Sequence, residues 1–433
     1  MLTSSYVGIN KHGHLEMDGA DCISLAEQFG TPLYVLSENS IRCSCRMFAK
    51  AMGDCFGEGR GVVAYASKAL CCKELCRIVA SEGLWLDVVS GGELYTASNI
   101  GFPSERIFFH GNNKTPSELE YALSEGVGYV VVDNKEELEL LDVLAREKNV
   151  RQRILLRIKP GVEAHTHKYI MTGSIDSKFG FALENGEAFD AVKRAILCGS
   201  LELCGLHCHI GSQIFEIAPF QEAARIMISL MMRIKNELGT ELSVLNLGGG
   251  FGMKYVDAND PVSPREILCG VALKIEETIG NSGFKSPTVV IEPGRAIAAP
   301  AGLTLYTVGA TKTIEGVRSY VSVDGGITDN PRYALYGSEY TVLVANRASE
   351  ARDFKATIAG RCCESGDLIQ ENTLLQRPRS GDILAVLATG AYNYSMSSNY
   401  NRVPKPPIVL VRDGEARVIV KGESYADVAS RDV

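Results

Sequence analysis

GVVAYASKAL, residues 61–70, holds an uncharged apolar run followed by one lysine, Lys68. Residues 62–66 have the pattern of a strand that is buried on both faces. The apolar residues of the next segment, 71–82, recur at helical spacing. A lysine at the point where a buried strand turns into a helix can lose its charge by desolvation and attack a carbonyl as an amine nucleophile. A solvated lysine at a strand end is the alternative interpretation of this segment taken alone.

Seven more apolar segments of strand length follow, with helical patterns between them. The eight predicted strands span residues 62–66, 84–89, 107–110, 128–132, 154–158, 203–209, 244–247 and 289–291. The predicted helices span residues 92–100, 117–125, 135–148, 188–198, 220–238 and 264–279. Such alternation is typical of a parallel sheet, either a closed β/α barrel or an open doubly wound sheet.

A polar or glycine feature stands near the C-terminal end of every predicted strand. In chain order these features are Lys68, Asp87, His110, Asp133, Arg157, His209, the run Gly248, Gly249 and Gly250, and Glu292. A barrel gathers the C-terminal ends of all its strands at one face, and active sites lie there. The pattern therefore favours an N-terminal (β/α)8 TIM-like barrel over the open sheet.

The pattern changes after about residue 300 to short, β-branched segments separated by Gly, Pro, Asn and Asp. Strands are predicted at residues 304–308, 320–323, 341–344, 354–359, 383–387, 408–411 and 416–420, with a hairpin turn at 412–415. No long helical stretch is evident. We expect a C-terminal β-sandwich or β-barrel domain, with residues 37–300 forming the barrel and residues 1–36 and 301–433 forming the β domain.

Composition narrows the classes of function. The 433 residues carry a net charge of -8 without a basic block, which disfavours nucleic acid and anionic membranes as partners. The N-terminus has no secretory signal pattern, and the apolar segments are too short to span a bilayer. Thirteen cysteines, an odd number, fit free thiols in a reducing cytoplasm better than a disulfide framework. Residues 204–209 contain two cysteines and two histidines, but we expect no metal site because a second ligand cluster is missing.

The triple glycine at 248–250 lies directly after the seventh predicted strand. Without Cβ atoms, a backbone loop can approach an anion closely and direct its N–H groups at it. Barrels often bind phosphate after strands seven and eight, although a tight turn that needs positive φ would have the same composition. Lys68, this loop, the imidazole of His209 and the carboxylate of Glu292 together suit pyridoxal 5′-phosphate. The lysine would form the Schiff base, the glycines would hold the phosphate, and Glu292 would keep the pyridine nitrogen protonated, which favours decarboxylation.

The chain resembles the fold-type III pyridoxal phosphate decarboxylases over nearly its whole length. The motifs that carry the resemblance occur in order: YASKA at 65–69, HCHIGSQ at 207–213, GGGFG at 248–252, EPGR at 292–295, NPRYALYG at 330–337, CESGD at 363–367 and GAY at 390–392. Within that family it is similar to the enzymes that convert meso-2,6-diaminopimelate into L-lysine and carbon dioxide, the last step of lysine biosynthesis.

The resemblance implies a role for each motif residue. Lys68 is the cofactor lysine, and Cys363 reprotonates the quinonoid intermediate. The cofactor contacts are Lys68, Asp87, His209, Ser212, Gly248, Gly249, Gly250, Glu292, Pro293, Gly294, Arg295 and Tyr392. The substrate contacts are Arg295, Arg332 and Tyr336 at the distal carboxylate, Glu364 at the distal ammonium, and Tyr392. Cys363 and Glu364 come from the neighbouring subunit in this family, so the resemblance implies a homodimer with shared active sites.

The residues themselves agree with a substrate that has a second carboxylate, because two arginines offer bidentate partners for it. A structural ion pair is the alternative role for these arginines, and an inert buried thiol is the alternative for Cys363. Three other activities stay open. They are a sister decarboxylase for carboxynorspermidine or a basic amino acid, a non-catalytic pyridoxal phosphate carrier, and an amino acid racemase, against which the Glu292 carboxylate argues.

Overall fold

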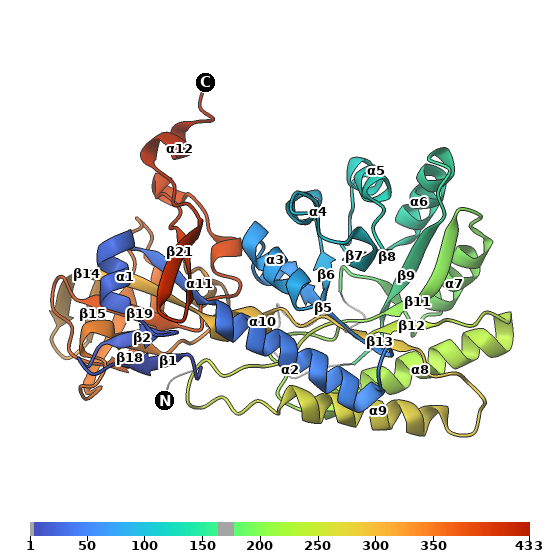
Figure 1. The fold of residues 1–433 in the computed structure, drawn as a ribbon, viewed down its shortest axis with the longest axis horizontal. Coiled ribbons are helices and arrows are strands. Elements are labelled where there is room, and N and C mark those ends of the chain that lie inside the picture. The colour runs from blue at the N-terminus through green and yellow to red at the C-terminus, as the bar shows by residue number, and fades with distance from the viewer. Residues whose placement is uncertain (1–3, 163–176) are drawn as a thin grey trace. The chain divides into compact units, whose positions relative to one another are not determined.

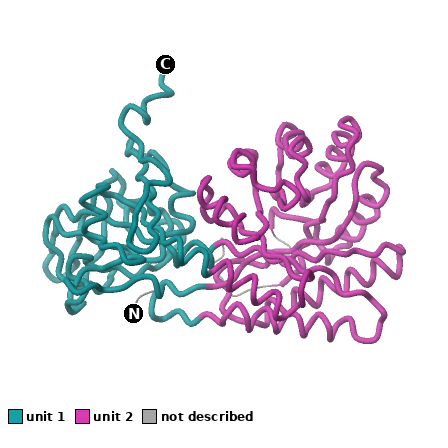
Figure 2. Tube along the Cα trace, in the orientation of Figure 1, with its two compact units in different colours: residues 1–43, 253–260, 295–433 teal, residues 44–252, 261–294 magenta. Residues whose placement is uncertain are grey.

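The computed structural model describes residues 4–162 and 177–433. The chain forms two compact units (Figure 2). Unit 1 comprises residues 1–43, 253–260 and 295–433, and unit 2 comprises residues 44–252 and 261–294. The chain therefore passes from unit 2 into unit 1 for eight residues after Gly252 and then returns.

Unit 2 contains a closed barrel of eight parallel strands (Figure 1). The barrel strands are β5 (Gly61–Ala66), β6 (Trp85–Val88), β7 (Ile107–Phe109), β8 (Tyr129–Val132), β9 (Gln152–Lys159), β11 (Leu201–His207), β12 (Val244–Asn246) and β13 (Thr288–Ile291). They pair in this order, β8 pairs with β9, and β13 pairs back with β5, which closes the barrel. A two-residue strand, β10 (Phe181–Ala182), adds to the end of β9. The prediction of a barrel is confirmed, and Phe108, Leu155 and Val290 pack among the side chains of its interior.

Helices alternate with the barrel strands. They are α3 (Lys73–Ser81), α4 (Gly91–Ser98), α5 (Pro116–Glu125), α6 (Lys135–Glu147), α7 (Glu187–Leu197), α8 (Ala218–Leu238) and α9 (Pro264–Ile279). The start of α5 is dictated locally. Thr115 accepts from the backbone N–H of Glu118, whose side chain accepts in return from the N–H of Thr115, and Pro116 takes the first helical position. Gly126 ends α5 in the left-handed conformation, which glycine adopts without steric cost.

One long helix was absent from the prediction. Helix α2 (Glu38–Phe56) follows strand β4 (Leu33–Ser37) without a turn between them. A strand that runs directly into a helix leaves no Gly or Pro signal in the sequence, and this explains the omission.

The expectation of free thiols in place of disulfides is wrong for one pair of cysteines. Cys55, near the end of α2, and Cys269, in α9, form a disulfide within unit 2, and the other eleven cysteines are free. The two residues are 214 positions apart, and sequence alone cannot assign such a connection.

Unit 1 is rich in sheet. Its strands are β1 (Val7–Ile9), β2 (Leu15–Met17), β3 (Ala20–Asp21), β4, β14 (Gly302–Ile314), β15 (Arg318–Val323), β16 (Val342–Val344), β17 (Phe354–Ala359), β18 (Leu368–Leu375), β19 (Ile383–Leu387), β20 (Ile408–Arg412) and β21 (Glu415–Val420). Its short helices are α1 (Cys22–Phe29), α10 (Arg295–Ala298), α11 (Arg332–Tyr336) and α12 (Tyr425–Ala429). The hairpin predicted at 412–415 is confirmed, since Arg412 pairs with Glu415 around Asp413 and Gly414, which both have positive φ.

Strand β4 ties the start of the chain to the C-terminal sheet by pairing with β14 and β20. Their apolar side chains, among them Leu33, Leu303 and Val409, form one buried core. Strand β18 is missing from the prediction because its sequence, LIQENTLL, does not follow a buried-apolar alternation: the polar Gln370 is buried, and the apolar Leu374 is exposed. Among the described residues, no helix is long and apolar enough to cross a membrane.

Candidate active site

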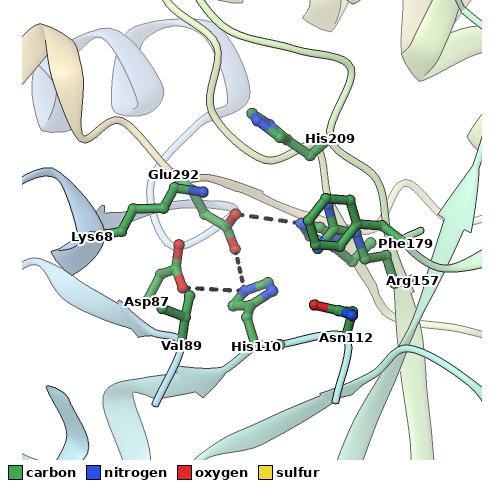
Figure 3. Close-up of a pocket in the computed structure, with 11 residues that line it drawn as sticks. Lys68, Asp87, Val89, His110, Asn112, Arg157, Phe179, His209 and Glu292 are labelled. Carbon is green, nitrogen blue, oxygen red and sulfur yellow. Dashed lines mark hydrogen bonds and ion pairs between the residues drawn. The ribbon is translucent and has the colours of Figure 1, made fainter. Parts of the chain in front are cut away.

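A cavity of about 330 Å³ lies at the C-terminal ends of the barrel strands (Figure 3). Its size is at the lower end of the range of about 300–1,000 Å³ that is common for small-molecule sites. It is lined by Lys68, Asp87, Val89, His110, Gly111, Asn112, Arg157, Phe179, His207, His209 and Glu292. Four residues predicted for the cofactor therefore face one space: Lys68, Asp87, His209 and Glu292.

Lys68 lies in a short 3-10 turn, Ser67–Ala69, directly after β5. The Ser67 hydroxyl donates to Oε2 of Glu93 at 2.6 Å, and the backbone N–H of Val89 donates to the same oxygen at 2.7 Å. Glu93 therefore ties the turn that carries Lys68 to the loop after β6. Burial raises the pKa of the Glu93 carboxyl above its ordinary value.

Glu292 follows β13, and its side chain is only 5% exposed. Asn246 donates to its Oε1 at 2.6 Å, and Nε2 of His110 lies 2.7 Å from the same oxygen. His207 lies with Nε2 3.3 Å from Oε2. Burial alone would raise the pKa of Glu292, but the contacts with His110 and His207 hold it well below the ordinary value. Glu292 is thus an anion aimed into the cavity. The ligand atoms of His110, His207 and Glu292 lie within 4.8 Å of one another, so this group could also hold a metal ion.

Asp87, at the end of β6, is a second buried carboxyl group. Burial raises its pKa to about 6, and its Oδ1 has no hydrogen-bond partner among the described residues. The carboxylate lies 3.8 Å from Nε2 of His110. Arg157 brings a positive charge to the other side of the cavity and lies 4.2 Å from the ring centroid of Phe179. Its Nε is 3.9 Å from Asp133.

His209 and the triple glycine form one backbone unit. The backbone N–H of Gly249 donates to Nδ1 of His209 at 3.2 Å, and the N–H of Gly248 donates to Oδ1 of Asn246 at 2.9 Å. A Cβ on Gly248 would lie 2.6 Å from the carbonyl oxygen of Cys208, and a Cβ on Gly249 would lie 2.4 Å from that of Glu292. Only glycine fits there. Since these two N–H groups already have acceptors, a phosphate would rely on the rest of the loop.

The cavity fits pyridoxal phosphate by its donor set. It offers one lysine amine, one carboxylate held in the charged form, and the His209 imidazole, whose pKa burial lowers well below its ordinary value. Two buried polar atoms, Oδ1 of Asp87 and Nδ1 of His207, have no hydrogen-bond partner among the described residues. Such atoms are costly to bury unless a bound group satisfies them.

A second cluster of predicted residues lies within unit 1. The guanidinium of Arg295 lies 4.7 Å from the ring centroid of Tyr392, and its Nη1 donates to the hydroxyl of Tyr255 at 2.9 Å. Arg332 donates through Nη1 to the hydroxyl of Tyr340 at 2.8 Å. Both arginines are buried. Tyr336 is half-buried in the same short helix, α11, that begins at Arg332.

The loop that contains Cys363 and Glu364 also belongs to unit 1, and both residues are exposed. The backbone N–H of Cys363 donates to Oδ1 of Asn401 at 2.7 Å. Cys362 is held on the other side, because its N–H donates to the buried Asp367 at 2.6 Å. The half-buried Ser212 follows β11 in unit 2, and Pro293 and Gly294 continue the chain from Glu292.

Two contributors were absent from the predicted site. Asn246 ends β12 with a side chain that is fully buried, and the signal for it is a lone polar residue within the apolar run 244–247. Tyr255 lies three residues beyond the glycine-rich loop, and sequence gives no sign that it meets two arginines. The sequence marks His110 and Arg157 only as polar residues near strand ends.

The sequence is similar to known pyridoxal-dependent decarboxylases over nearly its whole length. Residues 38–299 match the family described as "Pyridoxal-dependent decarboxylase, pyridoxal binding domain". The chain is 48% identical over 425 residues to the diaminopimelate decarboxylase of Bacillus subtilis, covering 98% of this chain and 96% of that protein. It is 44% identical to the diaminopimelate decarboxylase of Staphylococcus aureus, covering 98% and 99% of the two chains.

Solved structures agree. The diaminopimelate decarboxylase of M. jannaschii in complex with L-lysine superposes with a TM-score of 0.93 at 34% identity, covering 100% of this chain and 99% of that one. The Helicobacter pylori diaminopimelate decarboxylase, also with L-lysine, gives a TM-score of 0.86 at 29% identity, covering 94% and 98%.

Proposed function

The chain belongs to the pyridoxal-dependent decarboxylases, and from this premise we propose how its residues convert meso-2,6-diaminopimelate into L-lysine and carbon dioxide. The enzyme is a diaminopimelate-decarboxylating lyase with pyridoxal 5′-phosphate as its cofactor. The observation that carries the assignment of roles is the cavity in which the Lys68 amine and the charged Glu292 carboxylate face the same space.

Lys68 would hold the cofactor aldehyde, and Glu292 would accept a hydrogen bond from the protonated pyridine nitrogen. His209 would lie against the ring, with Asp87 and Ser212 beside it. The triple glycine and residues Pro293 to Arg295 would surround the phosphate. The cofactor supplies an electron sink for the pair that is released when carbon dioxide leaves. The role of the protein is to keep Glu292 charged and thereby to keep that sink effective.

Specificity would come from unit 1. Arg295 and Arg332, with Tyr336, would bind the distal carboxylate of the substrate, and Glu364 would bind its distal ammonium. Tyr392 would contact cofactor and substrate. A guanidinium matches a carboxylate in a planar, bidentate geometry, so this pair would discriminate against substrates that lack the second carboxylate. A decarboxylase for basic amino acids would need an acidic group where Arg332 lies.

The protonation step would use a thiol. Cys363 is exposed and its backbone N–H donates to Asn401, whereas both the backbone N–H and the thiol of Cys362 contact Asp367. We assign the proton donor to Cys363 and propose that Cys363 and Glu364 act in the active site of a second subunit, so that the enzyme works as a homodimer. In the same scheme the barrel binds the cofactor, and the β domain contributes substrate and dimer contacts. We propose a cytoplasmic location because eleven of the thirteen cysteines are free, with one disulfide between Cys55 and Cys269.

The cofactor assignment is tested by trapping. Borohydride treatment of the enzyme loaded with pyridoxal phosphate makes the bond between an amine and the aldehyde irreversible, and peptide mapping then locates it. We expect the label on the peptide that contains Lys68 and none in the Lys68→Ala variant. Label on another lysine would overturn the assignment.

A further inference from the structure

Tyr255 stands on a short segment that the chain inserts into unit 1. It is only 5% exposed, and its backbone is held from two sides. The backbone N–H of Tyr255 donates to Oδ1 of Asn259 at 3.0 Å, and the Tyr255 carbonyl accepts a hydrogen bond from the Thr341 hydroxyl at 2.9 Å. The ring packs edge-on against Tyr340, with centroids 5.5 Å apart. The side chain is therefore fixed before any ligand arrives.

Both arginines of the proposed carboxylate site contact this side chain. Arg295 donates from Nη1 to the Tyr255 hydroxyl at 2.9 Å. The guanidinium of Arg332 lies 5.1 Å from the centroid of the Tyr255 ring. Arg332 also donates to two neutral hydroxyls, from Nη1 to that of Tyr340 at 2.8 Å and from Nη2 to that of Ser338 at 3.1 Å. Tyr255 is thus the side chain that the two guanidinium groups share.

The positive charge of Arg332 has no carboxylate partner among the described residues around Tyr255. Arg332 is 4% exposed, and in the part of the chain that the structure describes no carboxylate lies within ion-pair distance of it. Burying a cation is costly unless an anion pairs with it. Burial raises the pKa of the Tyr255 phenol, but the charges of Arg295 and Arg332 outweigh this and hold it below its ordinary value. An anion bound at this cluster would be stabilised by both guanidinium groups. The Tyr255 oxygen, as a hydrogen-bond acceptor, compensates only part of their positive charge.

We propose that Tyr255 is a positioning residue that holds Arg295 and Arg332 in the arrangement that receives the distal carboxylate of the substrate. The inference rests on the proposed function, which gives the arginines that carboxylate as their ligand. Preorganised donors bind more tightly because less side-chain freedom is lost on binding. Without the phenol, both guanidinium groups keep their charge but lose the shared partner that fixes their direction. Tyr255 acts through the arginines and not on the reacting atoms.

Two amines separate this role from a purely structural one. L-lysine and cadaverine have the same primary amine at one end, but only L-lysine has a carboxylate at the other. We would measure the dissociation constants of both for the cofactor-loaded enzyme by calorimetry, in wild type and in Tyr255→Phe. The phenylalanine ring preserves the packing against Tyr340 and removes only the hydroxyl.

We expect Tyr255→Phe to weaken L-lysine binding by roughly 10- to 100-fold, the range for one hydrogen bond to a charged group, and to leave cadaverine binding within about twofold. KM for meso-2,6-diaminopimelate should rise by a similar factor, with kcat changed less. The matched control is Tyr333→Phe. Tyr333 lies next to Arg332 in helix α11, and its hydroxyl donates a hydrogen bond to Glu371 at 2.7 Å. This substitution should change neither amine's affinity.

Equal weakening of both amines, or an unchanged lysine-to-cadaverine ratio, would overturn the role of Tyr255. A wild-type enzyme that binds both amines equally would instead refute the proposed carboxylate site, so the two failures are distinguishable. If Tyr255→Phe does not retain cofactor, Thr341→Val takes its place, because it frees the Tyr255 carbonyl and leaves the ring intact. We expect it to reduce the ratio by about three- to tenfold, and an unchanged ratio in that variant would also overturn the proposal.

Discussion

Oε1 of Glu292 lies 2.7 Å from Nε2 of His110, and both side chains are buried and line the barrel cavity. His207 and Asn246 contact the same carboxylate. Three side chains from three strand ends therefore converge on one negative charge. Water screens charges strongly, and this site is shielded from water. The attraction between the Glu292 carboxylate and a cationic ring nitrogen is therefore stronger here than it would be in solvent.

Glu292→Gln should lower kcat for carbon dioxide release by about 100- to 1,000-fold, the usual effect of losing one preorganised electrostatic contact. The amide is the same size as the carboxylate and can still accept from Asn246, so the protein should fold and retain cofactor. The matched control is Glu137→Gln, since Glu137 is a buried glutamate that accepts from Lys114 at 2.6 Å and does not line the cavity. A kcat for Glu292→Gln within fivefold of the control would contradict the role.

Cys363→Ala should lower kcat by roughly 100-fold or more, as expected for the loss of a general acid, and should leave the cofactor absorbance unchanged. Cys362→Ala is the matched control and should stay close to wild type, because the Cys362 thiol contacts Asp367. Loss of cofactor from the Cys363 variant, or equal effects of the two substitutions, would refute the assignment. Steady-state kinetics and an absorbance spectrum of each variant are sufficient.

The shared active site predicts complementation between two inactive variants. When Lys68→Ala and Cys363→Ala subunits are mixed and allowed to exchange, half of the random dimers are hybrids with one intact site of two. Activity should therefore recover to about a quarter of the wild-type value. Each variant alone gives the baseline. No recovery, despite hybrid dimers detected by mass spectrometry, would show that both residues act in the same subunit.

Asp329 should make stability depend on pH. Burial raises its pKa to about 7, and the carboxyl group accepts from the hydroxyl of Tyr306 and the N–H of Gly326. The pKa of Asp329 in the folded state exceeds the unfolded value of 3.8, so the folded state binds a proton more tightly than the unfolded state does. The stabilisation from this bound proton is fully present below pH 3.8 and is lost as the pH rises through about 7. The loss is on the order of 4 kcal/mol at most.

Asp329→Asn preserves the acceptor and removes the titration. The melting temperature of the wild type should therefore fall more steeply than that of the variant as the pH rises from 3.8 to about 7. Asp190→Asn, at an exposed position beside Lys193, should keep the wild-type slope. Parallel slopes for wild type and Asp329→Asn would contradict the prediction.

Much of the barrel could be predicted because its strands are buried on both faces and end in polar residues. Lys68, His110 and Glu292 stand out in the sequence for this reason, and the structure brings them to one cavity. The start of α5 could also be predicted, because Thr115 and Pro116 are residue types that favour the first positions of a helix.

Other features depend on contacts between distant parts of the chain. Helix α2 lacks a turn before it, and the Cys55–Cys269 disulfide joins residues that nothing in the sequence relates. Strand β18 has an irregular register with β17, which obscures the alternation of buried and exposed residues. The contact of Tyr255 with Arg295 is a property of the folded unit alone, because the two residues are far apart in the sequence.

The central claim is tested most directly by carbon dioxide release from the purified enzyme with pyridoxal phosphate. The substrates to compare are meso-2,6-diaminopimelate, L-lysine, L-ornithine, L-arginine and carboxynorspermidine, with Lys68→Ala as the blank. The account predicts release from meso-2,6-diaminopimelate alone, with L-lysine as the product. Release from L-lysine or L-ornithine at a comparable kcat/KM, or no release from any of the five, would contradict it.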